Sequence, residues 1–153
     1  MDQRGKGEKL GIVVDASVAV KWVIPGEPDE TQAKLLRDSI FSGEVDAIAS
    51  LLLLYEVSSS LYKAVLKGIL QPADLSEALT ATGNLGIDVR ATDWDDLSQI
   101  VKIASETKLT TYDSTYLQLS RSTGYTLVTA DEKLAQKGEA SAKVVLLKNF
   151  SPT

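Results

Sequence analysis

Five short apolar segments, separated by helical patterns, constrain the fold of this chain more than any other feature of its sequence. The segments are rich in β-branched residues and cover residues 11–14, 45–49, 87–91, 126–129 and 143–147. Helical patterns of apolar residues cover 29–41, 50–68 and 94–107. The first segment, GIVV, has no polar side chain, as expected for a strand buried on both faces of a parallel sheet. Strands that alternate with helices predict an α/β fold, with a parallel β-sheet of four or five strands flanked by helices on both faces.

The length and composition indicate one globular domain. With 153 residues, of which 44% are hydrophobic and 24% charged, the chain can bury one core, and it shows no long linker. We expect a flexible N-terminal tail at residues 1–9, which are polar and lack the apolar run of a secretory signal, and a single domain at residues 10–150. The longest apolar run, residues 51–55, is far shorter than the ~20 residues of a membrane helix. These features predict a cytoplasmic protein with no membrane segment.

The absence of histidine and cysteine removes most catalytic options. The sequence contains neither residue, which excludes a Ser-His-Asp triad, a Cys-His dyad, a histidine-paired ribonuclease and zinc held by imidazole or thiolate. It also excludes disulfides, which fits a reducing compartment. Carboxylates, lysines, hydroxyl groups and hard metal ions remain as the possible agents of chemistry.

Four acidic residues from remote segments are the candidates for a metal site. Asp15 follows the first predicted strand in VVDAS, and Asp131 follows the fourth in TLVTAD. Both should therefore lie at the carboxyl edge of the sheet, where α/β folds bind their ligands. Asp113 begins the helical pattern YDSTYLQLS, and Glu56 lies within the helix predicted at 50–68. Taken singly, each aspartate could instead cap a turn or a helix, and Glu56 could simply be solvated.

A divalent cation would explain a convergence of these acids. Carboxylates within a few ångströms of one another repel and raise one another's pKa values, so a cation is needed to keep them ionised. Ligands that are all oxygen favour Mg²⁺ or Mn²⁺, which can lower the pKa of a bound water and orient it for attack on phosphorus. Ser17 and Thr129, each two residues from an aspartate of the set, could position water or metal. Their hydroxyls could equally bond to nearby backbone.

The helix predicted at 50–68 carries three different faces. Its expected core face is apolar and consists of Leu54, Val57, Leu61 and Val65. The opposite face is polar and consists of Glu56, Ser60, Lys63 and Lys67. The flank between them carries Tyr55, Tyr62 and Leu66. Because this flank extends the apolar surface beyond the core side, we expect another protein surface to cover it.

The net charge argues against a nucleic-acid binder. With 16 basic and 21 acidic residues the formal charge is −5, whereas proteins that bind nucleic acids usually present a basic surface. Contacts to phosphate would have to be local, and the candidates are Lys21, Lys63, Lys67 and Arg121. Lysines on a solvated helix face are also common without any ligand, so both interpretations stay open.

Four segments, in order and spacing, resemble the PIN domain, and in particular the VapC-type toxins of toxin-antitoxin pairs. They are VVDASVAVKWV, LLLLYEVSSSL, YDSTYLQLS and LVTADEKL, and the likeness runs from about residue 11 to 150. The resemblance implies a metal-dependent endoribonuclease with Asp15, Glu56, Asp113 and Asp131 as metal ligands and Ser17 and Thr129 as supporting hydroxyls. It also implies a homodimer, inhibited by an antitoxin segment that lies in the active-site groove.

The sequence departs from the family pattern at two places. Ala49 and Ser50 stand where a proline often precedes the glutamate helix, and Ser58 and Ser59 replace the commoner alanine and asparagine after the glutamate. These changes affect helix entry and the shape of the groove, but they leave the acidic set complete.

Other classes of protein also place acids at strand ends. A receiver domain would need paired acids after the first strand, and a haloacid-dehalogenase-type phosphatase would need Asp-x-Asp, whereas Ala16 and Ser17 follow Asp15. A PIN fold kept as an interaction module without turnover is the remaining alternative. The RNA target does not follow from the sequence.

Overall fold

One five-stranded parallel sheet organises the protein. The computed structural model describes residues 8–152, and residues 1–7 of the expected tail lie outside this range. The strands are β1 (Leu10–Val14), β2 (Val45–Ser50), β3 (Asp88–Arg90), β4 (Thr126–Thr129) and β5 (Val144–Leu146). Every neighbouring pair is parallel, in the order β3-β2-β1-β4-β5. The fold class predicted from the sequence is confirmed, and each predicted strand agrees with an observed one to within one residue at either end.

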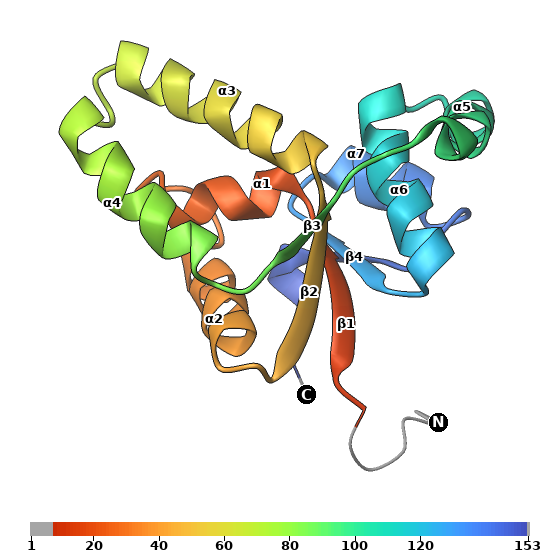
Figure 1. The fold of residues 1–153 in the computed structure, drawn as a ribbon, viewed down its shortest axis with the longest axis horizontal. Helices are drawn as coiled ribbons and strands as arrows, with labels where there is room; N and C mark the ends of the chain where they lie inside the picture. Colours follow the sequence, from red (N-terminus) through yellow and green to blue (C-terminus); the bar gives the residue numbers. More distant parts are fainter. Residues whose placement is uncertain (1–7, 153) are drawn as a thin grey trace.

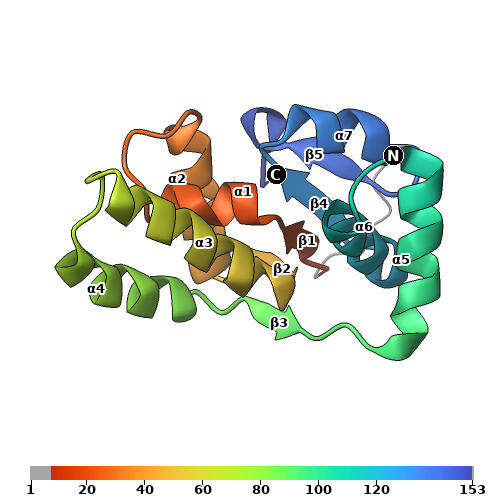
Figure 2. The ribbon, with the colours of Figure 1, turned by 90° about the horizontal axis from the view of Figure 1, so that it is seen from above.

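Helices cover both faces of the sheet (Figures 1 and 2). They are α1 (Ala16–Ala19), α2 (Glu30–Phe41), α3 (Leu52–Leu66), α4 (Pro72–Gly83), α5 (Trp94–Thr107), α6 (Thr111–Thr123) and α7 (Glu132–Gly138), with short 3₁₀ turns at Val20–Trp22 and Leu147–Asn149. The helices α1 to α4 lie on one side of the sheet and α5 to α7 on the other (Figure 2). The direction of strand addition explains this division, because right-handed crossovers change face when that direction reverses.

The reversal of direction places a switch point between β1 and β4. From β1 the chain adds β2 and then β3 on one side, and it returns to add β4 and β5 on the other. Ligands of open α/β sheets bind at the carboxyl ends of the strands at such a point. The topology thus predicts a site at the ends of β1 and β4.

Local capping interactions explain where three helices near this edge begin. The α5 helix starts with a capping box in which Asp93 and Asp96 bond reciprocally to each other's backbone N–H. The Thr110 hydroxyl caps α6 by accepting from the Asp113 N–H at 3.1 Å. Asp131 caps α7. These bonds satisfy the N–H groups that a helix N-terminus leaves without intrahelical partners.

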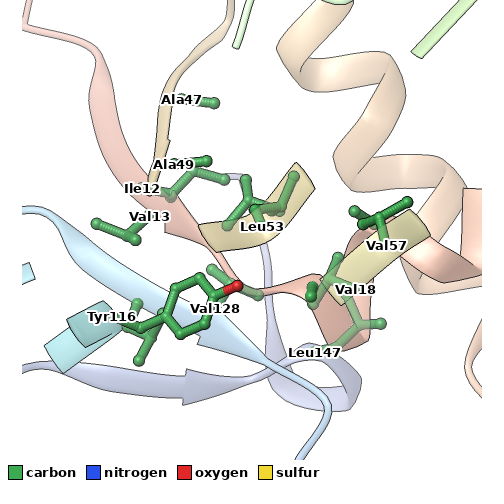
Figure 3. Packing of buried hydrophobic residues seen from close by; sticks show 14 of the residues in the cluster. Ile12, Val13, Val18, Ala47, Ala49, Leu53, Val57, Tyr116, Val128 and Leu147 are labelled. Carbon is green, nitrogen blue, oxygen red and sulfur yellow. The ribbon is translucent and has the colours of Figure 1, made fainter. Parts of the chain in front are cut away.

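The core lies on both faces of β1. Ile12, Val13 and Val14 have no exposed surface, which confirms that this strand is buried on both sides. Figure 3 shows part of the cluster, in which Tyr116 of α6 packs as one of the largest fully buried side chains. Among residues 8–152, no helix combines the length and the apolarity needed to cross a membrane.

The predicted core face of α3 is wrong by part of a turn. The buried residues of this helix are Leu53, Val57, Leu61 and Ala64. Leu54 is 49% exposed and lines a groove between α3 and α4. Two apolar stripes run along α3, one toward the sheet and one toward α4, and a single hydrophobic period cannot separate them. Because the buried face of α3 differs from the predicted one, Glu56 is half-buried rather than fully solvated.

Candidate active site

Asp15 lies at the carboxyl end of β1, at the switch point, and is buried. Its Oδ2 accepts hydrogen bonds from Ser17 Oγ and from Thr129 Oγ1, both at 2.6 Å. Each hydroxyl has one proton, so the 3.2 Å contact between Ser17 and Thr129 adds no further donor. The structure thus brings together three of the residues expected from the sequence, and it leaves Asp15 Oδ1 free of side-chain hydrogen bonds among the described residues.

Backbone groups of the β4–α7 loop hold the two hydroxyls in place. The Ala130 N–H donates to Ser17 Oγ at 2.9 Å, and the Asp131 N–H donates to Thr129 Oγ1 at 3.0 Å. Both hydroxyls therefore accept from backbone and donate to Asp15. The expected bonding of Ser17 and Thr129 to backbone is therefore present, and their role in positioning water or metal stays a prediction.

The environment of Asp15 favours its neutral form. Burial raises the pKa of this carboxyl, the hydrogen bonds from Ser17 and Thr129 oppose that rise, and the charge of Asp113 adds to it. The Asp15 side chain makes no capping bond to α1. Asp15 thus occupies the N-cap position of α1 without the side-chain bond of a helix cap, and capping does not account for its burial.

Asp131 and Asp113 stand at the N-termini of two helices, and the charge of one acts on the other. Asp131 Oδ1 accepts from the N–H groups of Lys133 and Leu134 at 2.9 and 3.1 Å, so this residue does cap α7. Its Oδ2 takes no part in that cap. The pKa of Asp113 is raised by burial first and by the charge of Asp131 second, while Thr110 and the cation of Lys133 lower it.

Glu56 reaches the same region from α3. Its Oε1 accepts a hydrogen bond from the Tyr116 hydroxyl at 3.1 Å. Burial raises the Glu56 pKa, as do the charges of Asp15 and Asp113, and the Tyr116 bond lowers it. Because Asp15 and Asp113 both repel Glu56, the acids from β1, α3 and α6 share one electrostatic field.

The donor set fits a hard divalent cation. None of the ion pairs found among residues 8–152 involves Asp15, Glu56, Asp113 or Asp131, so their mutual repulsion has no salt-bridge partner. In the same range no three acidic side chains stand close enough to complete a ligand sphere by themselves. Mg²⁺ commonly binds through one or two carboxylates plus waters and a substrate phosphate, so an incomplete protein sphere suits it.

A cavity of about 320 Å³ opens beside Glu56. It is lined by Ala16, Ser17, Val20, Glu56, Ser59, Ser60 and Lys63. Small side chains and hydroxyls form most of this wall, and Lys63 supplies a positive charge. The cavity is thus lined by both polar and apolar groups.

The other cations expected to contact phosphate do not line this cavity. Lys21 is buried and pairs with Glu27 at 3.8 Å, so its amine is not presented to a ligand. Lys67 ends α3 one turn beyond Lys63. Arg121 lies in the last turn of α6, whereas Asp113 lies in the first. Of these candidates, only Lys63 lines the cavity.

Sequence reasoning missed two residues of this region. Lys133, whose charge acts on Asp113, stands two residues after Asp131, and its place in LVTADEKL was the available signal. Tyr116 stands three residues after Asp113, a spacing that puts both on one side of a helix. In the sequence Tyr116 looks like a core residue because its ring is apolar. The structure shows that its ring is indeed part of the core.

Comparison with known proteins gives one family. Residues 12–140 match the PIN domain. The chain is 26% identical over 129 residues to Ribonuclease VapC3 of Pyrobaculum aerophilum, across 84% of this chain and 95% of that protein.

Solved structures show the same fold. The crystal structure of PAE2754 from Pyrobaculum aerophilum has a TM-score of 0.67 at 22% identity and covers 91% of this chain and 90% of its own. FitAcB from Neisseria gonorrhoeae has a TM-score of 0.66 at 14% identity, over 91% of this chain and 99% of that one. VapBC2 from Rickettsia felis, bound to a DNA fragment from their promoter, has a TM-score of 0.63 at 10% identity. The match covers 90% of this chain and 98% of that one.

Proposed function

The chain belongs to the PIN domain family, and on that basis we propose that it is an endoribonuclease that depends on Mg²⁺ or Mn²⁺. The observation that carries the proposal is the buried Asp15 carboxylate at the switch point, held by two hydroxyls and raised in pKa by burial and by Asp113. Burying an ionised acid without a cationic partner is costly, and a bound cation would offset that cost. The similarity to a protein named Ribonuclease VapC3 supports RNA as the substrate.

The proposed ligands are Asp15, Glu56, Asp113 and Asp131. A bound Mg²⁺ or Mn²⁺ would lower the pKa of a coordinated water and neutralise charge on the scissile phosphate. Ser17 and Thr129 fix the orientation of Asp15, so that its second oxygen faces the site with little loss of side-chain freedom.

The cavity beside Glu56 is the proposed path of the RNA. Lys63 would contact a phosphate there, while the hydroxyls of Ser59 and Ser60 can bond to phosphate or ribose oxygens. The test is cleavage of RNA by the purified protein, which should require a divalent cation and stop when EDTA removes it.

We further propose that the protein is a toxin with an antitoxin partner, and that it forms a homodimer. An apolar groove of about 550 Å³ runs between α3 and α4. Tyr62, which is 64% exposed, lines this groove, while Tyr55 and Leu66 are exposed on the same helix. An apolar groove of this kind suits the apolar face of a partner helix.

The alternatives now differ in support. A receiver domain is excluded by membership of the PIN domain family. A PIN fold without turnover would still bind a partner through the groove, but it gives no reason for a buried acid that Ser17 and Thr129 hold at the switch point. Cation-dependent cleavage distinguishes it from the nuclease.

A further inference from the structure

Tyr116 connects the two helical layers across the carboxyl edge of the sheet. It lies on α6, on the opposite side of the sheet from α3 (Figure 2). Its ring has no exposed surface and belongs to the core cluster (Figure 3). Its hydroxyl nevertheless reaches α3, where it lies 3.1 Å from Oε1 of Glu56. The core packing of the ring therefore fixes the position of a donor inside the acidic site.

The direction of this hydrogen bond is defined. A tyrosine hydroxyl keeps its proton at neutral pH, because its ordinary pKa is about 10. Tyr116 is therefore the donor and the Glu56 carboxylate the acceptor. Only Oε1 is engaged, so Oε2 remains for a cation.

Glu56 lacks the constraints that hold Asp15 and Asp131. Asp15 is held by Ser17 and Thr129, and Asp131 by the backbone at the start of α7. Glu56 has a longer side chain, and among residues 8–152 the Tyr116 hydroxyl is the hydrogen-bond donor that the structure places on it. A ligand fixed by a neighbouring hydrogen bond binds a metal better than a freely rotating one.

We propose that Tyr116 is a positioning residue, which holds Glu56 in the orientation that binds the divalent cation. This inference rests on the proposed function. Tyr116 itself touches neither substrate nor cation; it acts through Glu56. Its loss should therefore weaken cation binding without removing a ligand.

The test is Mn²⁺ binding to the full chain, measured by titration calorimetry. Tyr116→Phe keeps the buried ring and removes only the hydroxyl. Tyr125→Phe is the matched control, because the Tyr125 hydroxyl also donates to a carboxylate, Asp46 Oδ2 at 2.6 Å, but at the amino edge of the sheet. We expect Tyr116→Phe to weaken Mn²⁺ binding about tenfold or more and Tyr125→Phe to leave it unchanged.

A double-mutant cycle separates positioning from a general effect on structure. If Tyr116 acts through Glu56, adding Tyr116→Phe to Glu56→Gln should weaken binding no further than Glu56→Gln does alone. Multiplying losses would overturn the inference, as would unchanged Mn²⁺ binding by Tyr116→Phe.

A second variant leaves the core intact. Glu56→Asp keeps the charge, but its shorter side chain cannot keep the bond to Tyr116, so it should weaken Mn²⁺ binding at least as much as Tyr116→Phe does. Wild-type affinity in Glu56→Asp would contradict the proposal. If the wild type itself bound no Mn²⁺, the proposed function would fail and this inference with it, whereas binding by the wild type and equally by Tyr116→Phe would overturn the inference alone.

Discussion

The hydroxyl of Thr129 donates to Oδ2 of Asp15 at 2.6 Å and so joins the carboxyl ends of β4 and β1. The two residues are 114 positions apart in the chain, yet neighbouring strands bring them together at the point where the order of strand addition reverses. The bond fixes the orientation of a buried acid. It also places the site at this edge, because Thr129, the last residue of β4, holds an acid that directly follows β1.

Asp15→Asn should stabilise the protein when no metal is present. At a pH where Asp15 is ionised, the change removes a buried charge that Asp113 repels, while the amide oxygen can still accept from Ser17 and Thr129. For a chain of this size each kcal/mol of repulsion removed raises the melting temperature by ~2–4 °C.

Scanning calorimetry in EDTA and in millimolar Mn²⁺ measures the metal-free stability and the response to the cation. The wild type should melt higher with Mn²⁺, because a cation that binds only the folded state stabilises it by mass action, by ~2.7 kcal/mol at a hundred times its dissociation constant. Asp15→Asn should lose most of that response. Melting curves of the wild type that coincide with and without Mn²⁺ would rule out a preformed site.

The metal-free protein should become less stable as the pH rises above the ordinary carboxyl range. Asp15, Glu56 and Asp113 all have raised pKa values in the folded state. Between the unfolded and the folded pKa the native state binds more protons, so the free energy of unfolding falls with rising pH. The stability is present below this window and is lost above it.

Saturating Mn²⁺ should oppose this trend, because a cation binds the ionised carboxylates and competes with protons. Melting temperatures measured from about pH 5 to pH 8 in EDTA and in Mn²⁺ test both statements. Asp15→Asn should flatten the metal-free profile. A wild-type profile in EDTA that rises steadily with pH would contradict the assigned directions of the pKa shifts.

Lys63→Gln should weaken RNA binding more than it slows the chemical step. Lys63 lines the cavity beside Glu56, and losing one phosphate contact on a single strand lowers the salt slope of binding by ~0.7. Arg121→Gln removes the same charge at the far end of α6 from Asp113 and serves as the control. Filter binding at several salt concentrations gives the slopes, and equal losses for the two variants would place the RNA elsewhere.

Tyr62→Arg should disrupt association with a second subunit or with an antitoxin. Tyr62 is exposed and lines the apolar groove between α3 and α4, where an added charge would be desolvated on binding. Leu35→Arg, at an exposed apolar position of α2, is the control. Sedimentation of both variants and of the wild type decides, and a wild type that stays a strict monomer at high concentration would remove the homodimer from the account.

The sheet and the position of Asp15 could be predicted because both depend on local pattern. The run GIVV has no polar side chain that could face solvent, which predicts a strand buried on both faces. An acid that follows such a strand lies at the carboxyl edge of a parallel sheet. The convergence of Asp15 with Thr129 could be expected for the same reason, since each stands at the end of a strand.

Contacts between helices on opposite sides of the sheet could not be predicted in this way. The bond from Tyr116 to Glu56 depends on how far α3 and α6 overhang the edge, and no spacing in the sequence encodes that distance. The burial of Lys21, which pairs with Glu27, and the exposure of Leu54 depend on packing within one side of the sheet. A single helical period identifies a polar or apolar stripe, but tertiary packing decides which neighbour covers it.

The most direct measurement of the central claim is cleavage of a single-stranded RNA by the wild type, by an Asp15→Asn, Asp113→Asn double variant and by a control of equal charge change. The control, Asp38→Asn with Asp95→Asn, alters exposed acids on α2 and α5. We predict that the wild type and the control cleave in Mn²⁺ and not in EDTA, and that the folded site variant cleaves orders of magnitude more slowly. Cleavage at the wild-type rate by a site variant purified free of contaminating nuclease would contradict a metal-dependent ribonuclease. Cleavage by the wild type in EDTA would contradict it as well.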